Sequence, residues 1–298
     1  MSRKKISVCI THYNRPHTLA RTLESLARQT RVPDEVFLWD DCSPRDPSEV
    51  VREWADRFPH FVYHRNAQNL NMPGNLNEVI AQATGDYVAN LHDADIYDPC
   101  LLEKWSAALD RYPEAGLVFC RDSRWDNPRF VETWTPDPPE FLKGVNFFDR
   151  YFLGHVDSII WGTVMVRRSL YERLLPFDSQ FRNWADVDMW MRICSISGIA
   201  YVPKLLITLD ENPTHGGGFS FQRMKRVQSM VYVNAQRIFK GEKRVQALKI
   251  QRRTWRRLWL RWMLGRLRRG EWLELCKGLQ TNMLHGDFGE SSVGDLGK

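Results

Sequence analysis

The chain of 298 residues has 42 Lys or Arg, 36 Asp or Glu and 43% hydrophobic residues, an ordinary composition for a soluble globular protein. This length suits one large domain or two modest ones with a sizeable core. No uninterrupted apolar run reaches the roughly 18 residues of a membrane span, and the first one, residues 6–10, is too short for a signal-peptide core. We therefore expect a cytoplasmic protein.

The net charge of +6 is unevenly distributed. Residues 240–269 hold twelve Lys or Arg and one acid, Glu242, which leaves the rest of the chain at about −5. A slightly acidic protein with one basic segment indicates a local anionic partner and argues against nucleic-acid binding. The six cysteines are scattered without a CxxC spacing, so neither a zinc site nor a disulfide framework is indicated.

Strand and helix patterns alternate with short connections from residue 6 to residue 120. Short runs rich in apolar and β-branched residues predict strands at residues 6–10, 35–39, 61–64, 87–91 and 117–120. Helical spacing of apolar residues predicts helices at residues 16–29, 46–57, 71–83 and 99–111. This order is typical of an α/β fold with a Rossmann-like, mostly parallel sheet covered by helices.

The alternation ends after Cys120. Residues 121–150 are rich in Pro, Trp and Asp and show little periodicity. The later pattern predicts a strand at 159–166, helices at 169–174 and 186–196, and an edge strand or loop at 200–207. From Phe219 onward it is helical, apart from a polar tail. We expect a catalytic domain over residues 1–215 and a helical, basic C-terminal extension over residues 216–298.

Four polar clusters fall at the carboxyl ends of predicted strands or at the start of a helix. In open α/β sheets, ligands bind at the carboxyl ends of the strands. The clusters are Thr11-His12-Tyr13-Asn14-Arg15, Asp40-Asp41, Asp93-Ala94-Asp95 and Asp186. Two carboxylates one residue apart suit a divalent cation and, through it, the phosphates of a nucleotide. Each cluster alone could be a turn, a helix cap or an acid favoured by a helix dipole, but together they indicate a functional site.

This ordered set resembles the family-2 glycosyltransferases, which are inverting enzymes with the A-type nucleotide-sugar fold. Residues 8–15 are similar to the opening motif of the family, and residues 39–43, Trp-Asp-Asp-Cys-Ser, to its Asp-Asp-Gly-Ser stretch. Residues 83–87 match the stretch that precedes the acidic motif of the family, which corresponds here to Asp93-Ala94-Asp95. Residues 186–192 resemble the family's acidic residue followed by Leu-Trp-Leu-Arg. The resemblance covers about residues 5–210.

The resemblance implies sugar transfer from a nucleotide-diphosphate donor, usually UDP-linked, to a hydroxyl of a glycan or lipid-linked glycan in polysaccharide biosynthesis. It implies Asp186 as the general base and Mn²⁺ or Mg²⁺ as the cofactor. The implied nucleotide-binding residues are Thr11, Tyr13, Asn14, Arg15, Asp40 and Asp93. The implied metal ligands are Asp95 and Asp93, with His215 of a glycine-rich segment as a further candidate or part of a flexible linker.

The acidic motif departs from the pattern of the family. Many members read Asp-x-Asp-Asp before a similarly spaced proline, and counting back from Pro99 gives His92-Asp93-Ala94-Asp95. Ala94 then stands where a metal-binding aspartate is common. Either Asp95 replaces that ligand or metal binding is weak, and we favour Asp95.

Two other functions stay open. One is a metal-dependent nucleotidyltransferase. Residues 11–15 argue against it, because they lack the glycine of a phosphate-binding loop. The other is a catalytically impaired peripheral membrane or scaffolding protein of the same fold. Ala94 supports that alternative, and the presence of Asp186 opposes it.

Residues 252–269 predict a basic amphipathic helix. At about 100° per residue, one face carries Trp255, Leu258, Trp259, Trp262 and Met263, and the other carries Arg253, Arg257, Arg261 and Arg268. Such a helix fits an anionic membrane surface, whose headgroups would contribute about 1 kcal/mol per Lys or Arg. We expect peripheral binding to the inner membrane face; the alternative is an aromatic face packed on the protein with a solvated basic face.

Overall fold

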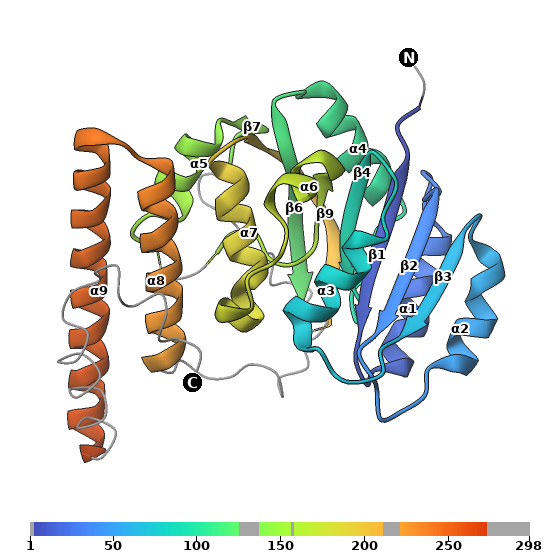
Figure 1. Ribbon diagram of the computed structural model, residues 1–298, viewed down its shortest axis with the longest axis horizontal. Coiled ribbons are helices and arrows are strands. Elements are labelled where there is room, and N and C mark those ends of the chain that lie inside the picture. Colours follow the sequence, from blue (N-terminus) through green and yellow to red (C-terminus); the bar gives the residue numbers. More distant parts are fainter. Residues whose placement is uncertain (1–2, 125–136, 156–157, 211–220, 273–298) are drawn as a thin grey trace. The chain divides into compact units, whose positions relative to one another are not determined.

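The computed structural model describes residues 3–124, 137–155, 158–210 and 221–272. The chain divides into two compact units, residues 1–147 with 160–216 and residues 148–159 with 217–298. The first unit is an α/β structure and the second is helical (Figure 1).

The elements of the first unit alternate in the order expected from the sequence. Its strands are β1 (Ile6–His12), β2 (Glu35–Asp40), β3 (Phe61–Arg65), β4 (Tyr87–His92), β5 (Ile96–Tyr97), β6 (Ala115–Arg124), β7 (Phe141–Leu142), β8 (Val164–Arg167) and β9 (Gly198–Leu209). Its helices are α1 (Pro16–Ala27), α2 (Ser48–Trp54), η1 (Ala55–Arg57), α3 (Asn71–Ala81), α4 (Leu101–Arg111), α6 (Arg168–Leu174), η2 (Ser179–Trp184) and α7 (Ala185–Cys194). Helix α5 (Gly144–Tyr151) runs from the first unit into the second.

The strands of the described chain form one sheet in the order β3-β2-β1-β4-β8-β6-β9-β5, and β7 pairs with β9. Strand β1 pairs in parallel with β2 and with β4, β2 pairs in parallel with β3, and β6 pairs in parallel with β9. Strand β8 lies antiparallel between β4 and β6. The prediction of an α/β, Rossmann-like and mostly parallel sheet is therefore confirmed.

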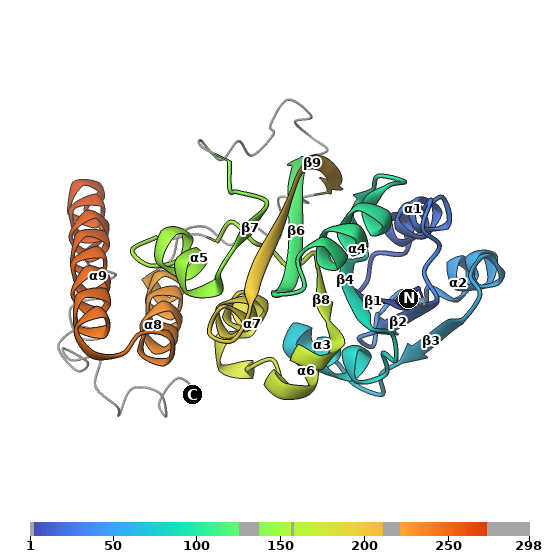
Figure 2. The same ribbon diagram turned by 90° about the horizontal axis from the view of Figure 1, so that it is seen from above.

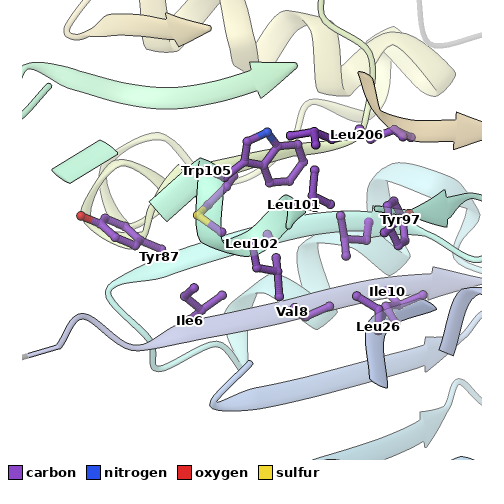
Figure 3. Close-up of a cluster of buried hydrophobic side chains, with 14 of the residues drawn as sticks. Ile6, Val8, Ile10, Leu26, Tyr87, Tyr97, Leu101, Leu102, Trp105 and Leu206 are labelled. Carbon is purple, nitrogen blue, oxygen red and sulfur yellow. The ribbon is translucent and has the colours of Figure 1, made fainter. Parts of the chain in front are cut away.

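Helices cover both faces of this sheet. Helices α1, α2 and α4 lie on one face, and α3, α6 and α7 lie on the other (Figures 1 and 2). On the first face, Ile6, Val8 and Ile10 of β1 pack with Leu101 and Trp105 of α4 (Figure 3). Each large apolar side chain that is fully buried contributes about 1.5–3 kcal/mol, so this layer fixes the sheet that positions the strand ends.

Two later expectations were wrong in detail. The strand predicted over residues 159–166 begins only at Val164. Before it, the carbonyl of Gly162 accepts a hydrogen bond from Asn90 Nδ2 at 2.6 Å, so this carbonyl is bound by a side chain and not by a neighbouring strand. Residues 200–207 belong to β9, which is an interior strand because it pairs with β6 on one side and with β5 and β7 on the other.

The second unit contains two antiparallel helices, α8 (Phe221–Ile238) and α9 (Gly241–Arg269) (Figure 1). Two buried glutamines join them, because Gln251 Nε2 donates to Gln228 Oε1. Gln251 Oε1 also accepts from the N–H of Gly154 at 3.3 Å. These contacts satisfy the buried amides and tie both helices to the segment after α5.

Candidate functional site

The carboxyl ends of β1, β2 and β4 lie next to one another. Strand β1 is central, and its register places His12 opposite Asp40 of β2 and Thr11 opposite His92 of β4. Parallel strands bring their carboxyl ends to the same edge of a sheet. Polar residues that are far apart in the sequence, from residue 11 to residue 95, therefore gather at this edge, where α/β sheets bind ligands.

Asp93 is held by the loop that follows β1. Its Oδ2 lies 2.7 Å from His12 Nδ1 and accepts the N–H of Tyr13 at 3.2 Å. Its Oδ1 accepts from Arg15 NH1 at 3.4 Å. Asp93 and His12 are buried, so these contacts compensate the desolvation of the carboxylate. Both oxygens are already in use, and Asp93 therefore joins the acidic motif to residues 12–15.

The loop after β1 keeps several polar groups available. The phenol ring of Tyr13 is exposed, at 46%. Asn14 has a φ of 57°, a conformation that asparagine tolerates better than most residues, and its N–H donates to Ser43 Oγ at 2.7 Å. In the described part of the chain, no group donates a hydrogen bond to the buried Oδ1 of Asn14. Thr11, near the end of β1, is half-buried, and it adds a hydroxyl group to these polar residues.

Asp40 and Asp41 differ sharply in their surroundings. Asp40 is fully buried, and its Oδ1 accepts from the N–H of Ser43 at 3.0 Å and from the Ser43 hydroxyl. Its Oδ2 accepts from the Tyr63 hydroxyl at 3.2 Å and lies 3.6 Å from Arg65 Nε. Burial, and then the charge of Asp40, raises the pKa of Tyr63 to about 12, so its phenol stays protonated as a donor.

Asp41 keeps one oxygen available. Its Oδ1 accepts from Asn66 Nδ2 at 3.1 Å and from the N–H of Leu70 at 2.7 Å. Its Oδ2 makes no hydrogen bond to any described residue. Asp40 thus stabilises the end of β2, and Asp41 is the member of the pair with an oxygen that can accept a further hydrogen bond.

Asp95 has different neighbours from those of Asp93. Its Oδ2 accepts from Thr163 Oγ1 at 3.3 Å and lies 3.5 Å from His92 Nδ1. Its Oδ1 has no hydrogen-bond partner among the described residues. Desolvation by itself would lower the pKa of His92, but the hydrogen bond to Asp95 and the charges of Asp95, Asp186 and Asp93 outweigh it and raise that pKa.

These surroundings fit a divalent cation that is shared with a phosphate ligand. Across the described ranges, no three or more His, Cys, Asp or Glu side chains form a metal cage by themselves. Mg²⁺ typically binds one or two carboxylates and takes its other ligands from substrate phosphates and water, and Asp95 Oδ1 offers one such oxygen. His215, the further metal candidate, lies outside the described residues.

Asp186, at the start of α7, is brought to the acidic motif by the tertiary structure. Its side chain is buried, and Oδ1 accepts the N–H of Val187 at 2.7 Å. Burial raises the pKa of Asp186 to about 6. A Cβ placed on Gly162 would lie 2.3 Å from His92 Nε2 and 3.1 Å from Asp186 Oδ2. Gly162 therefore lies where His92, which precedes the acidic motif, and Asp186 approach each other.

The structure thus gathers Thr11, Tyr13, Asn14, Arg15, Asp40 and Asp93 around the ends of β1, β2 and β4. Asp95 and Asp186 both adjoin His92, one by contact and the other across Gly162. Sequence reasoning did not single out His12, Asp41, His92 or Gly162 as site residues. His12 and Asp41 lie inside motifs that it recognised, whereas Gly162 gives no local signal because its partners lie 70 and 24 residues away in the sequence.

Comparisons with known proteins identify the family of the chain. The sequence profile of Glycosyl transferase family 2 matches residues 7–175, and the chain belongs to that family. It is 28% identical over 199 residues to the putative glycosyltransferase EpsE of Bacillus subtilis, covering 64% of this chain and 67% of that protein. It spans 51% and 65% of two further curated relatives, CgeD of Bacillus subtilis and the uncharacterized glycosyltransferase MJ1057 of Methanocaldococcus jannaschii.

Solved structures show the same fold. S. aureus TarS 1-349, whose structure with UDP-GlcNAc is known, superimposes with a TM-score of 0.67 at 17% identity over 82% of this chain and 70% of that chain. The mannosyltransferase PcManGT of Pyrobaculum calidifontis, solved with GDP-Man and Mn²⁺, gives a TM-score of 0.60 at 17% identity over 98% of this chain and 79% of that chain.

Proposed function

We propose that this chain is an inverting glycosyltransferase that moves a sugar from a nucleotide-diphosphate donor, in particular a UDP-sugar, to a hydroxyl of a glycan or lipid-linked glycan. The observation that carries the proposal is the approach of Asp186 and His92 at Gly162, together with the 3.5 Å separation between His92 Nδ1 and Asp95 Oδ2. A carboxyl group with a raised pKa near an acidic motif, at the strand ends where α/β sheets usually bind ligands, supports a catalytic role. The first compact unit would be the catalytic domain expected over residues 1–215.

The base and ribose of the donor would lie against the ends of β1 and β2. The exposed ring of Tyr13 offers a surface for stacking, and Thr11 lies two residues earlier, near the end of β1. We assign the acceptor for an N–H of the base to Asp41 Oδ2, with Asp40 supporting that strand end through Ser43 and Tyr63. Asn14 Oδ1 is a second acceptor that lacks a donor in the described chain.

Asp93 and Arg15 would act at the ribose and diphosphate end. Arg15 precedes α1, whose first N–H groups lack helical partners, and is 31% exposed at its side chain. A cation beside a helix N-terminus suits a diphosphate. Asp93 keeps Arg15 and the N–H of Tyr13 in place.

Asp95 would hold Mn²⁺ or Mg²⁺ together with the diphosphate of the donor. A bound metal would offset the charge that builds on the departing diphosphate. The contribution of this chain is the free Oδ1 of Asp95, whose other oxygen is fixed by Thr163 and His92. Ala94, in the position of a common metal ligand, is buried at 4% exposure and supplies no ligand.

Asp186 would take the proton from the hydroxyl of the acceptor. As that proton moves to the carboxylate, the hydroxyl oxygen forms a bond to the anomeric carbon and the bond from that carbon to the diphosphate oxygen breaks. The diphosphate leaves with the electron pair on the opposite face, so the configuration inverts. A pKa of about 6 leaves Asp186 ionised at neutral pH yet more basic than an ordinary carboxylate. A positioned general base typically increases the reaction rate about 10²–10⁴-fold.

A panel of nucleotide sugars tests this proposal. Thermal unfolding of the full chain would be followed with UDP-GlcNAc, UDP-glucose and GDP-mannose, each with and without Mn²⁺. A donor at about 100 times its Kd stabilises the folded state by about 2.7 kcal/mol, so it raises Tm measurably. Asp186→Asn should keep that shift and lose sugar transfer and donor hydrolysis. The proposal fails if no nucleotide sugar raises Tm, or if Asp186→Asn turns over the donor at the wild-type rate.

A further inference from the structure

The second half of α9 exposes a row of leucines. Leu260, Leu264 and Leu267 are 50%, 51% and 38% exposed. Their spacing of four and then three residues places them on one face of the helix. A contiguous apolar row with a polar rim is the usual mark of an interaction site, whereas single exposed leucines are not.

Arginines surround this row. Arg256 and Arg257 lie one turn before Leu260, and Arg261 and Arg268 lie one turn on either side of Leu264. All four are exposed, and within the described residues none of them has an ion-pair partner. We call Leu260, Leu264 and Leu267 with these four arginines the leucine–arginine face. The nearby acid, Glu271, is already paired with Arg266 and Arg269.

The opposite face of α9 carries the tryptophans, and it is buried. Trp255 and Trp262 are 8% and 6% exposed. They pack in a cluster with Leu258, Trp259 and Met263. The aromatic face, which the sequence suggested for contact with lipid, is therefore used inside the protein, and the leucine–arginine face is the one left for a partner.

We propose that the leucine–arginine face binds the surface of a membrane rich in anionic lipid, with α9 lying in the plane of the interface. Apolar side chains would enter the boundary between headgroups and acyl chains while the arginines meet lipid phosphates. No helix among the described residues is long and apolar enough to cross a bilayer, so a surface contact is the mode that this helix offers. A second copy is a poor occupant, because it would bring two sets of like charges together.

Flotation of the full-length protein with vesicles tests the proposal. Vesicles of equal parts phosphatidylglycerol and phosphatidylcholine would be compared with pure phosphatidylcholine. The protein should float with the anionic vesicles only, and binding should weaken at high salt. Leu260→Gln/Leu264→Gln should weaken binding at least about ten-fold, because it removes apolar area that would be buried in the interface. Arg257→Gln removes one positive charge and should weaken binding to the anionic vesicles about five-fold.

A matched control replaces two exposed apolar residues of the first unit. Leu205 and Ile196 are 44% and 41% exposed, so Leu205→Gln/Ile196→Gln alters similar surface and should leave binding unchanged. Absence of binding to anionic vesicles, or equal loss in the control and the leucine variant, would overturn the proposal. A dimer in light scattering that Leu260→Gln/Leu264→Gln converts to monomer, without vesicle binding, would reassign the face to self-association. The assay uses no donor or acceptor, so it is independent of the proposed transferase function.

Discussion

His12 Nδ1 lies 2.7 Å from Asp93 Oδ2, and this contact joins the carboxyl ends of two neighbouring parallel strands, β1 and β4. Both side chains are buried. Arg15 and the N–H of Tyr13 approach the same carboxylate. The loop after β1 and the acidic motif are therefore held together by the protein's own groups.

Breaking this contact should destabilise the first unit. His12→Ala leaves the buried Asp93 carboxylate without its shortest partner, which should lower the free energy of unfolding by about 1–3 kcal/mol in urea denaturation. Arg15→Ala is the control, because its contact is longer and partly exposed, and it should lower that free energy by less than about 1 kcal/mol. Equal effects of the two variants would show that the His12–Asp93 contact is unimportant.

Activity should depend on the ionisation of Asp186. Because burial raises the pKa of this residue to about 6, the carboxylate becomes protonated below that pH and can no longer accept a proton. The logarithm of kcat should fall with a slope of about one as the pH drops below 6. Donor binding measured by calorimetry should stay nearly constant over the same range. A kcat that is flat from pH 7 to pH 5 would exclude Asp186 as the base.

Asp186→Asn should make the protein more stable at neutral pH. The pKa of Asp186 is higher in the folded protein, about 6, than its ordinary value of 3.8, so the folded state binds the proton more tightly and stability falls as the pH rises toward 6. Asparagine removes this penalty. The gain should reach up to about 3 kcal/mol at pH 7–8 and vanish near pH 4.

Asp188→Asn is the matched control for that measurement. Asp188 lies on the same helix and is buried, but its Oδ2 is 2.8 Å from Arg192 Nε. Removing its charge leaves a largely buried arginine without its carboxylate partner, so the same substitution should destabilise the protein at pH 7. A stabilising effect in both variants would mean that helix α7 simply tolerates asparagine, without a specific cost at Asp186.

Gly162→Ala should impair catalysis more than donor binding. The new Cβ would lie 2.3 Å from His92 Nε2, so the imidazole or the nearby Asp186 must move. Misplacing a catalytic group by about 1 Å can reduce the rate about 100-fold. We expect kcat to fall about 10–100-fold, with a much smaller change in donor Kd. Gly265→Ala is the control, because its Cβ would meet only the end of the Arg269 side chain at 3.6 Å, and its kcat should not change.

Asp95 and Asp93 should respond differently to metal. In a titration of transfer with Mn²⁺, Asp95→Asn should raise the concentration for half-maximal activity at least about ten-fold, because it removes the free carboxylate oxygen. Asp93→Asn should chiefly lower stability, since its two oxygens serve His12, Tyr13 and Arg15. An unchanged Mn²⁺ requirement in Asp95→Asn would remove that residue from the metal site.

The sequence by itself determined the strands and helices of the N-terminal half and the polar residues that follow each strand. Strand β2 illustrates the reason, because its apolar run and the acidic pair after it are local signals that need no distant partner. The α/β fold and the positions of Asp40, Asp93 and Asp186 at element ends follow from such signals. The family motifs added the expected roles of these residues.

Only the tertiary structure decided how these residues are used. Asp40 and Asp41 are adjacent in sequence, yet one is saturated by Ser43 and Tyr63 and the other keeps an oxygen free. The same holds for α9, whose periodicity defines two faces but not which of them is buried. Hydrogen bonds and packing between distant segments set these outcomes. The free energy of such interactions depends on contacts in three dimensions, which a local sequence pattern does not contain.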